Sequence, residues 1–152
     1  MPLLCAVQRK TYIRDGRAPI PSDPRTSALM SRIRARDTGP ERTLRALLSS
    51  HGVRGYRLNY AKAPGRPDIA FVGRRVAVFV HGCFWHGCPH CRPRRPGSNR
   101  SFWEAKLDRN MARDRRKVRD LRKEGWRVCT IWECRLKKNP EREVARVMAM
   151  LD

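Results

Sequence analysis

The spacing of apolar residues predicts four helices along the chain. The run 40–52 has leucines at helical spacing behind Pro40, which suits the first position of a helix, and His51-Gly52 suits its end. Ser101 and Glu104 have the spacing of a capping box, so we expect the serine to cap another helix. The further helices predicted in this way are a short basic one over 26–35, a long charged one over about 101–124 and a last one that begins at Asn139-Pro140.

Apolar runs and polar alternation predict four strands. The runs 69–72 and 76–80 are separated by Gly73-Arg74-Arg75 alone, so they are expected to form a hairpin. Alternation also predicts strands at 56–60 and 126–132. The hairpin brings Asp68, at the start of one strand, beside His81, at the end of the next. An acid beside a histidine at an open hairpin end is a candidate metal or catalytic site.

This order of elements predicts an α/β domain whose helices pack against a mixed central sheet. We expect residues 25–152 to form one domain, because the 152-residue chain is long enough for one ordinary core. Residues 1–24 contain four prolines and scattered arginines, which predicts a basic tail with little to bury.

Charge narrows the choice of partner. The chain has 35 Lys and Arg against 14 Asp and Glu, a net charge of +21, which favours a polyanion such as nucleic acid. No stretch approaches the ~20 apolar residues that span a bilayer, which argues against a membrane. Leu3-Leu4-Cys5-Ala6-Val7 is too short for a signal peptide, so we expect a cytoplasmic, nucleoid-associated protein whose thiols stay reduced. Reduced cysteines are more naturally metal ligands than disulfides.

The segment His81–Cys91 concentrates the candidate chemistry, with three histidines, three cysteines and two adjacent aromatic residues. Cys83, Cys88 and either His90 or Cys91 fit a closed tetrahedral zinc site, and spacing alone favours Cys91. Cys134 is the best distant ligand because it follows a strand whose end can approach the segment, whereas Cys129 lies in mid-strand and suits the core.

Two features have a structural explanation beside a functional one. Phe84 and Trp85 have no apolar periodicity around them, so they either cover the metal segment or make a specific contact with a ligand. Glu41, in the first turn of its helix, suits the helix dipole and equally suits a polar site.

Several short motifs together resemble the very short patch repair (Vsr) DNA mismatch endonucleases. The resemblance covers about residues 26–136 in uninterrupted order and is specific as a combination. The motifs that carry it are Met30, Arg36-Asp37-Thr38 with Glu41, Pro64-Gly65-Arg66-Pro67-Asp68, His81-Gly82-Cys83-Phe84-Trp85-His86, Phe102-Trp103, Asn110 with Arg113-Asp114-Arg115-Arg116, Gly125-Trp126 and Trp132-Glu133-Cys134.

The resemblance implies a restriction-endonuclease-like fold with a structural zinc, and an enzyme that nicks one DNA strand next to the thymine of a T:G mismatch. Such mismatches arise when 5-methylcytosine deaminates, so the implied process is DNA repair. The implied substrate is double-stranded DNA with a T:G mismatch, bound by a monomer that accessory mismatch-repair proteins could assist.

The resemblance also implies residue roles. Asp68 matches a Mg²⁺ ligand, Val80 a position that binds the metal through its backbone carbonyl, and His86 the general base. The polar residues that match supporting positions are His81, Glu41 and Asp114. The family's register implies zinc ligands at Cys83, Cys88, His90 and Cys134, with Cys91 as the competitor of His90. The aromatic residues that match a wedge in the base stack are Phe84, Trp85 and Trp103, and Met30 matches a residue inserted from the opposite groove.

Two other functions remain open from the sequence. The chain could be a nuclease of the same fold that cuts other mismatches or symmetric restriction-type sites. It could also be a zinc-stabilised DNA-binding module without catalysis, although such a module has no need of Asp68 and His86.

Overall fold

The computed structural model describes residues 23–152, and the chain divides into one compact unit that ends at Arg32 and a second that spans Ile33–Asp152. In the first unit, α1 runs over Pro24–Ser31. It begins two residues earlier than the predicted helix and ends four residues sooner, and Ile33, predicted to belong to it, is exposed. Most of the predicted tail, over 1–22, lies outside the described residues.

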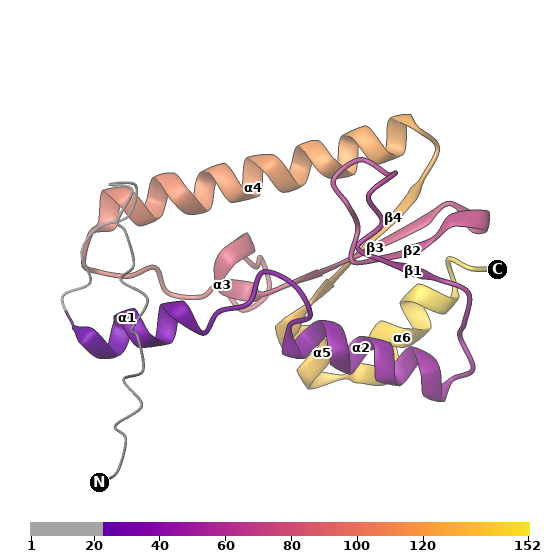
Figure 1. The fold of residues 1–152 in the computed structure, drawn as a ribbon, viewed down its shortest axis with the longest axis horizontal. Coiled ribbons are helices and arrows are strands. Elements are labelled where there is room, and N and C mark those ends of the chain that lie inside the picture. Colours follow the sequence, from indigo (N-terminus) through magenta and orange to yellow (C-terminus); the bar gives the residue numbers. More distant parts are fainter. Residues whose placement is uncertain (1–22) are drawn as a thin grey trace, which may run out of the picture. The chain divides into compact units, whose positions relative to one another are not determined.

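The second unit is built on a four-stranded mixed sheet in the order β1-β2-β3-β4 (Figure 1). The strands are β1 (Arg57–Leu58), β2 (Ile69–Phe71), β3 (Val76–His81) and β4 (Arg127–Trp132). The β1–β2 and β2–β3 pairs are antiparallel, which confirms the predicted hairpin, and β3 pairs with β4 in parallel. The parallel pair brings the ends of β3 and β4 to the same edge, so that His81 lies opposite Trp132.

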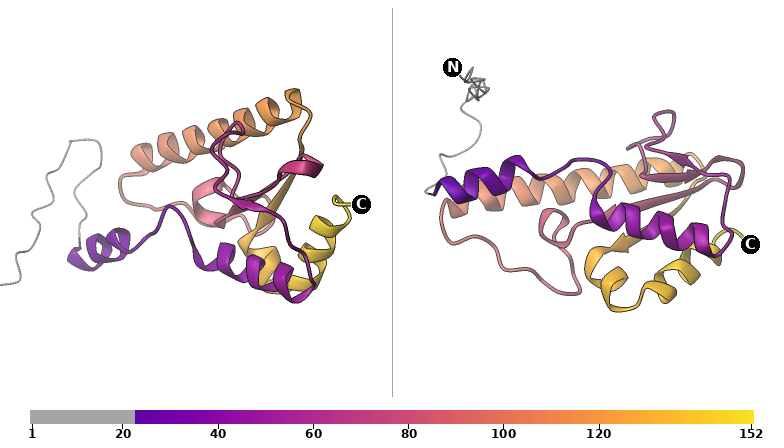
Figure 2. Two further views of the ribbon diagram at one scale, coloured as in Figure 1. Left: turned by 45° about the vertical axis from the view of Figure 1, so that its right-hand side comes forward. Right: turned by 60° about the horizontal axis from the view of Figure 1, so that its bottom comes forward.

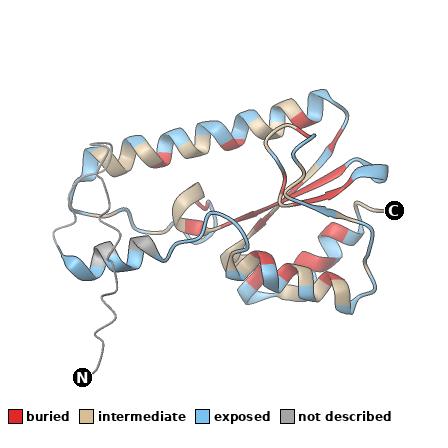
Figure 3. Cartoon of the chain, viewed as in Figure 1, coloured by how far each residue is buried: buried red, intermediate tan, exposed pale blue. Residues whose placement is uncertain are grey.

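Helices cover both faces of this sheet. On one face lie α2 (Gly39–Ser50), α5 (Glu133–Lys138) and α6 (Pro140–Met148), and on the other lies α4 (Arg100–Lys123), as Figure 2 shows from two further directions. The larger core packs Leu44, Leu48, Val144 and Val147 against Val78. The smaller core, beneath α4, contains Ala63, Ala70, Ala77, Phe79, Leu121 and Trp126. Figure 3 shows the buried residues concentrated in the sheet and on the helix faces turned toward it. The predicted mixed α/β architecture is therefore confirmed.

Helix caps follow the sequence in two places and depart from it in a third. Thr38 caps α2, and Asn139 caps α6 through a hydrogen bond from the Arg142 N–H. The predicted capping box at Ser101 is wrong. The helix begins at Arg100 after Asn99, which has φ 51° and makes no side-chain cap, and Glu104 binds the Arg100 Nε at 2.8 Å instead. Both groups of that ion pair are on the surface, so the acid finds a cation one turn away rather than a backbone N–H.

Three local differences concern short elements. The strand predicted over 69–72 stops at Phe71, because Val72–Arg74 turns into a single 3-10 turn, η1, that leads to Arg75 at φ 50°. The cysteine-rich segment after β3 begins with one helical turn, α3 (Cys83–His86), which Gly87 ends at φ 62°. Within residues 23–152, no helix has the length and apolar character needed to cross a bilayer.

Candidate active site and metal cluster

Asp68 lies where the sequence placed it, at the entrance of β2 and beside the end of β3. Its Oδ2 accepts the backbone N–H of Val80 at 2.7 Å, which joins the two strands of the hairpin at this point. Its other carboxylate oxygen, Oδ1, has no hydrogen-bond partner among residues 23–152. A carboxylate held by one oxygen, with the second left available, is suited to bind a cation.

Burial raises the pKa of Asp68 from 3.8 to about 6, and the negative charge of Glu41 adds to this effect. The N–H of Val80 and the positive charges of Lys117 and His86 act in the opposite direction. The carboxylate is therefore electrostatically unsatisfied, because its desolvation outweighs the interactions that favour its charged form. A divalent cation would relieve this imbalance, so the donor chemistry at Asp68 fits the implied metal.

His86 is oriented by Asp114, which reaches it from α4. The Nδ1 atom of His86 and the Oδ2 atom of Asp114 are 2.5 Å apart. Burial acts to raise the pKa of Asp114, but the hydrogen bond and charge of His86, with contributions from His81 and Lys117, lower it below its ordinary value. An ionised Asp114 fixes the proton of His86 on Nδ1 and leaves Nε2 free to accept another.

His81 packs against this pair through its ring. Its ring stacks on that of His86, with centroids 4.0 Å apart and an interplanar angle of 6°. Burial, together with the charge of His86, lowers the pKa of His81 from 6.5 to about 4 despite the opposing charge of Asp114, so the ring is neutral at pH 7. His81, His86 and Asp114 each offer a ligand atom within 4.8 Å of the others. However, the in-plane lone pairs of two parallel stacked rings cannot converge on one ion, so the arrangement is better suited to proton transfer than to chelation.

Glu41 is buried and completes a capping box at the start of α2. Its Oε1 accepts the Thr38 hydroxyl at 2.9 Å and its Oε2 accepts the backbone N–H of Asp37 at 3.0 Å. Both carboxylate oxygens are thus engaged in holding the helix end, and the charge also acts on Asp68. In this structure the residue combines the structural role with an electrostatic one.

Four cysteines form a second cluster. Cys83, Cys88, Cys91 and Cys134 place their Sγ atoms within 4.8 Å of one another, and these residues form no disulfide. The Sγ atoms of Cys88 and Cys134 are 3.6 Å apart. Zinc–sulfur bonds of about 2.3 Å in a regular tetrahedron would separate the sulfurs by about 3.8 Å, so the spacing fits a metal ion.

The geometry favours the alternative ligand set, in which Cys91 takes the place of His90. The four-donor group contains Cys91, while the exposed His90 ring lies 6.3 Å from the ring of Trp132. His90 contributes through its backbone: burial acts to raise the pKa of Cys88, but the N–H groups of Cys91 and His90 outweigh this and lower it. The turn between Cys88 and Cys91 thus directs the second thiol, and not the intervening imidazole, toward the cluster.

The three predicted wedge aromatics of α3 and α4 form one group. The ring centroids of Phe84, Trp85 and Trp103 are 5.0 to 6.0 Å apart. The ammonium of Lys106 lies 5.3 Å from the Trp103 ring and 5.4 Å from the Trp85 ring. Asn110 donates a hydrogen bond to the carbonyl of Trp85 at 3.1 Å, which ties α3 to α4. Met30 belongs to α1 in the other unit, and its side chain lies outside what the structure describes.

Sequence reasoning missed Lys117. Its ammonium lies 3.8 Å from Asp114 Oδ1 and acts on the pKa values of Asp68, His81 and Asp114. Its stem passes beneath the turn that presents Asp68, where a Cβ on Gly65 would collide with it. The helical spacing from Asp114 to Lys117 was a usable signal, but it did not distinguish this lysine from its many basic neighbours.

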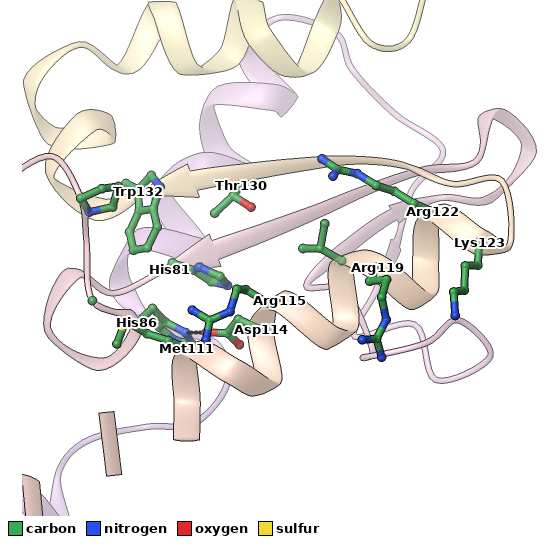
Figure 4. Close-up of a pocket in the computed structure, with 13 residues that line it drawn as sticks. His81, His86, Met111, Asp114, Arg115, Arg119, Arg122, Lys123, Thr130 and Trp132 are labelled. Atoms are coloured by element: carbon green, nitrogen blue, oxygen red, sulfur yellow. Dashed lines mark hydrogen bonds and ion pairs between the residues drawn. The ribbon is translucent and has the colours of Figure 1, made fainter. Parts of the chain in front are cut away.

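A groove of about 790 Å³ runs from these histidines along α4 and β4 (Figure 4). His81, His86 and Asp114 line one end, and Thr130 and Trp132 of β4 line one side. The remaining lining residues are Gly87, Pro89, Met111, Arg115, Val118, Arg119, Arg122 and Lys123.

Comparison with known proteins gives a consistent result. Residues 21–92 match the model of the family described as DNA mismatch endonuclease Vsr. The type II nicking enzyme V.XorIIP of Xanthomonas oryzae is 47% identical over 116 residues, which cover 76% of this chain and 84% of that protein. The DNA mismatch endonuclease Vsr of Escherichia coli is 41% identical over 109 residues, covering 71% of this chain and 69% of that protein. The type II nicking enzyme V.NaeI of Lentzea aerocolonigenes is 42% identical over 133 residues, 84% of this chain and 79% of that protein.

The class that these matches define is that of the DNA endonucleases. Within it, the chain belongs to the Vsr family of DNA mismatch endonucleases.

Proposed function

We propose that this chain is a Mg²⁺-dependent endonuclease of restriction-endonuclease-like fold that nicks one strand of duplex DNA next to the thymine of a T:G mismatch. The observation that carries the proposal is the desolvated carboxylate of Asp68, which accepts the Val80 N–H near the end of β3 and whose pKa is influenced by the charge of His86, the partner of Asp114. The name of the Escherichia coli relative supports a DNA mismatch as the substrate, and the names of the other two relatives support nicking of one strand. The process served would be repair of deaminated 5-methylcytosine.

In this proposal, Asp68 and the backbone carbonyl of Val80 hold the divalent cation. When bound, the cation would neutralise charge on the scissile phosphate and lower the pKa of a bound water. Asp68 is suited to this task because its Oδ1 is unpaired and its Oδ2 is oriented by the Val80 N–H.

His86 acts as the general base. Asp114 holds the proton on Nδ1, so Nε2 is the atom that removes a proton from the attacking water. His81, neutral at pH 7, stacks on His86 and keeps its ring in place without adding a competing charge. Glu41 anchors the start of α2 and tunes Asp68, and Lys117 adds positive charge to the same site.

The four-cysteine cluster binds a structural zinc. The metal would join α3, the turn 88–91 and the start of α5. With zinc bound, Cys83 would fix the position of the adjacent Phe84 and Trp85, from which, with Trp103, they would enter the base stack. Insertion costs a few kcal/mol and costs least at a poorly paired step, so deformability contributes to mismatch selection. Met30 of α1 would enter from the opposite groove.

The decisive experiment is a nicking assay on end-labelled duplexes that carry T:G, each other mismatch, or a matched pair, with and without Mg²⁺. We expect one cut, next to the mismatched thymine, in the presence of Mg²⁺ only. Equal cutting of matched or symmetric sites would instead show a restriction-type nuclease. Tight binding with no cutting of any duplex, by protein that retains its zinc, would show a DNA-binding module.

A further inference from the structure

The groove between α4 and β4 continues beyond the residues that the proposed function uses. Its far part is lined by Arg115, Arg119, Arg122 and Lys123 from one side of α4, and by Thr130 and Trp132 from β4. Figure 4 shows these basic side chains following one another along the helix, from Arg115 beside His86 to Lys123 at the other end. None of them has a role in the proton transfer or in the metal sites described above.

The cations in this groove are largely uncompensated. Among residues 23–152, the side chains of Arg115, Arg122 and Lys123 make no hydrogen bond or ion pair, and Arg119 pairs only with its neighbour Asp120, at 3.2 Å. The single acid in the lining, Asp114, is already engaged by His86. The end of the groove is polar as well, because the buried Nδ1 of His81 has no partner.

The length of the row indicates what kind of anion would fit. From Arg115 to Lys123 the helix rises by about 12 Å, with a cation at nearly every turn. A single phosphate would contact one or two of these side chains, whereas a chain of phosphates could contact all of them. The strand that forms one side, β4, is at the edge of the sheet, and its Thr130 carbonyl accepts a hydrogen bond from Arg146 at 3.4 Å.

We propose that this groove is a backbone-binding track, defined by Arg115, Arg119, Arg122 and Lys123, that holds the phosphates of the DNA flank leading away from the nicked position. The track deepens the proposed function, and it rests on that function only in taking DNA as the partner. Because phosphate contacts carry no base information, the track strengthens binding of matched and mismatched duplexes alike.

The simpler explanation is that Arg122 and Lys123, in the last turn of α4, only complement the helix dipole. The two explanations differ in what they predict for salt dependence. A dipole contact stabilises the fold and leaves DNA affinity unchanged, whereas each phosphate contact adds about 0.9 to the slope of log Kd against log salt concentration.

The test is to measure this slope for the double variant Arg122→Gln/Lys123→Gln, on matched and T:G duplexes, without added divalent cation. We expect the slope to fall by about 1.8 on both duplexes, and by about 0.9 for Arg119→Gln, which lies in mid-helix away from the dipole end. The matched control is Lys138→Gln/Arg142→Gln, which removes the same net charge. Lys138 is the last residue of α5 and Arg142 lies in α6, and both are exposed on the opposite face of the sheet. The single-turnover nicking rate at saturating DNA should stay at the wild-type value.

A fall in slope no larger than that of the control would overturn the track, as would a loss confined to T:G duplexes. If the double variant has a lower melting temperature but an unchanged slope, Arg122 and Lys123 stabilise the end of α4 and do not contact DNA. The binding measurement uses matched DNA too, so it can be read even if T:G nicking is never found. Conversely, normal T:G nicking with an unchanged slope would reject the track and leave the proposed function standing.

Discussion

Replacement of Asp68 by Asn should make the protein more stable at neutral pH when no Mg²⁺ is present. The folded carboxyl has a pKa of about 6 because of its burial, against 3.8 for the ordinary group. A raised pKa means that the folded state binds the proton more tightly than the unfolded state does. The free energy of unfolding contributed by Asp68 therefore decreases as pH rises from about 4 to 6, and at 1.36 kcal/mol per pH unit the loss is about 3 kcal/mol.

Asn cannot ionise, and its amide oxygen can still accept the Val80 N–H that Asp68 accepts at 2.7 Å. The difference in unfolding free energy between Asp68→Asn and the wild type should thus grow by about 3 kcal/mol between pH 4 and pH 7.5. Urea denaturation at a series of pH values, in buffer without chelator so that a bound zinc is retained, measures this difference. Asp108→Asn, at an exposed carboxylate of α4, controls for the substitution itself.

Adding Mg²⁺ supplies a second comparison at pH 7.5. A cation bound by Asp68 stabilises the wild type by about 2.7 kcal/mol at one hundred times its Kd, and leaves Asp68→Asn unchanged. If Asp68→Asn is no more stable than the wild type at pH 7.5, or if its advantage is the same at pH 4, then Asp68 is not an electrostatically unsatisfied carboxylate. If Mg²⁺ stabilises both proteins equally, the metal is held elsewhere.

Three further predictions concern the other parts of the site. Asp114→Asn should lower the single-turnover nicking rate by about 10² to 10⁴-fold, because Nδ1 of His86 loses the carboxylate that fixes its proton, while Asp108→Asn should keep the wild-type rate; equal rates for the two would contradict the pairing as a catalytic device. Cys91→Ala should reduce bound zinc and thermal stability, and His90→Ala should leave one zinc per chain by atomic absorption; the reverse result would restore the imidazole as the ligand. Trp85→Ala should raise the Kd for T:G duplexes more than for matched duplexes, and an equal rise on both would assign the ring to packing alone.

Local patterns determined much of this molecule. The leucines before His51, the Thr38 cap and the Asn139-Pro140 start depend on neighbours in the chain, so the starts of α2 and α6 were predictable to within a residue and the end of α2 to within two. The hairpin was also predictable from the sequence, because two apolar runs joined by only three residues usually pair as antiparallel strands. The proximity of Asp68 to the end of β3 followed from it.

Other features depended on packing between distant segments. The convergence of Cys91 with Cys83 and Cys134 is set by the direction of a turn, whereas the family register alone pointed to the imidazole of His90. Sequence patterns also missed α5, which is only six residues long, and they predicted a cap at Ser101 that the surface ion pair of Glu104 replaces.

The sequence by itself determined the helices, the hairpin and the presence of an acid, histidines and thiols in one region, because these follow from spacing within a few residues. Only the tertiary structure decided how those groups pair. Asp114 reaches His86 across 28 positions, and Lys117 reaches the same site because the turn at Gly65 leaves room for its stem. Such contacts arise when α4 packs on the smaller core, and the energy of that packing is distributed over residues that carry no chemical signature in the sequence.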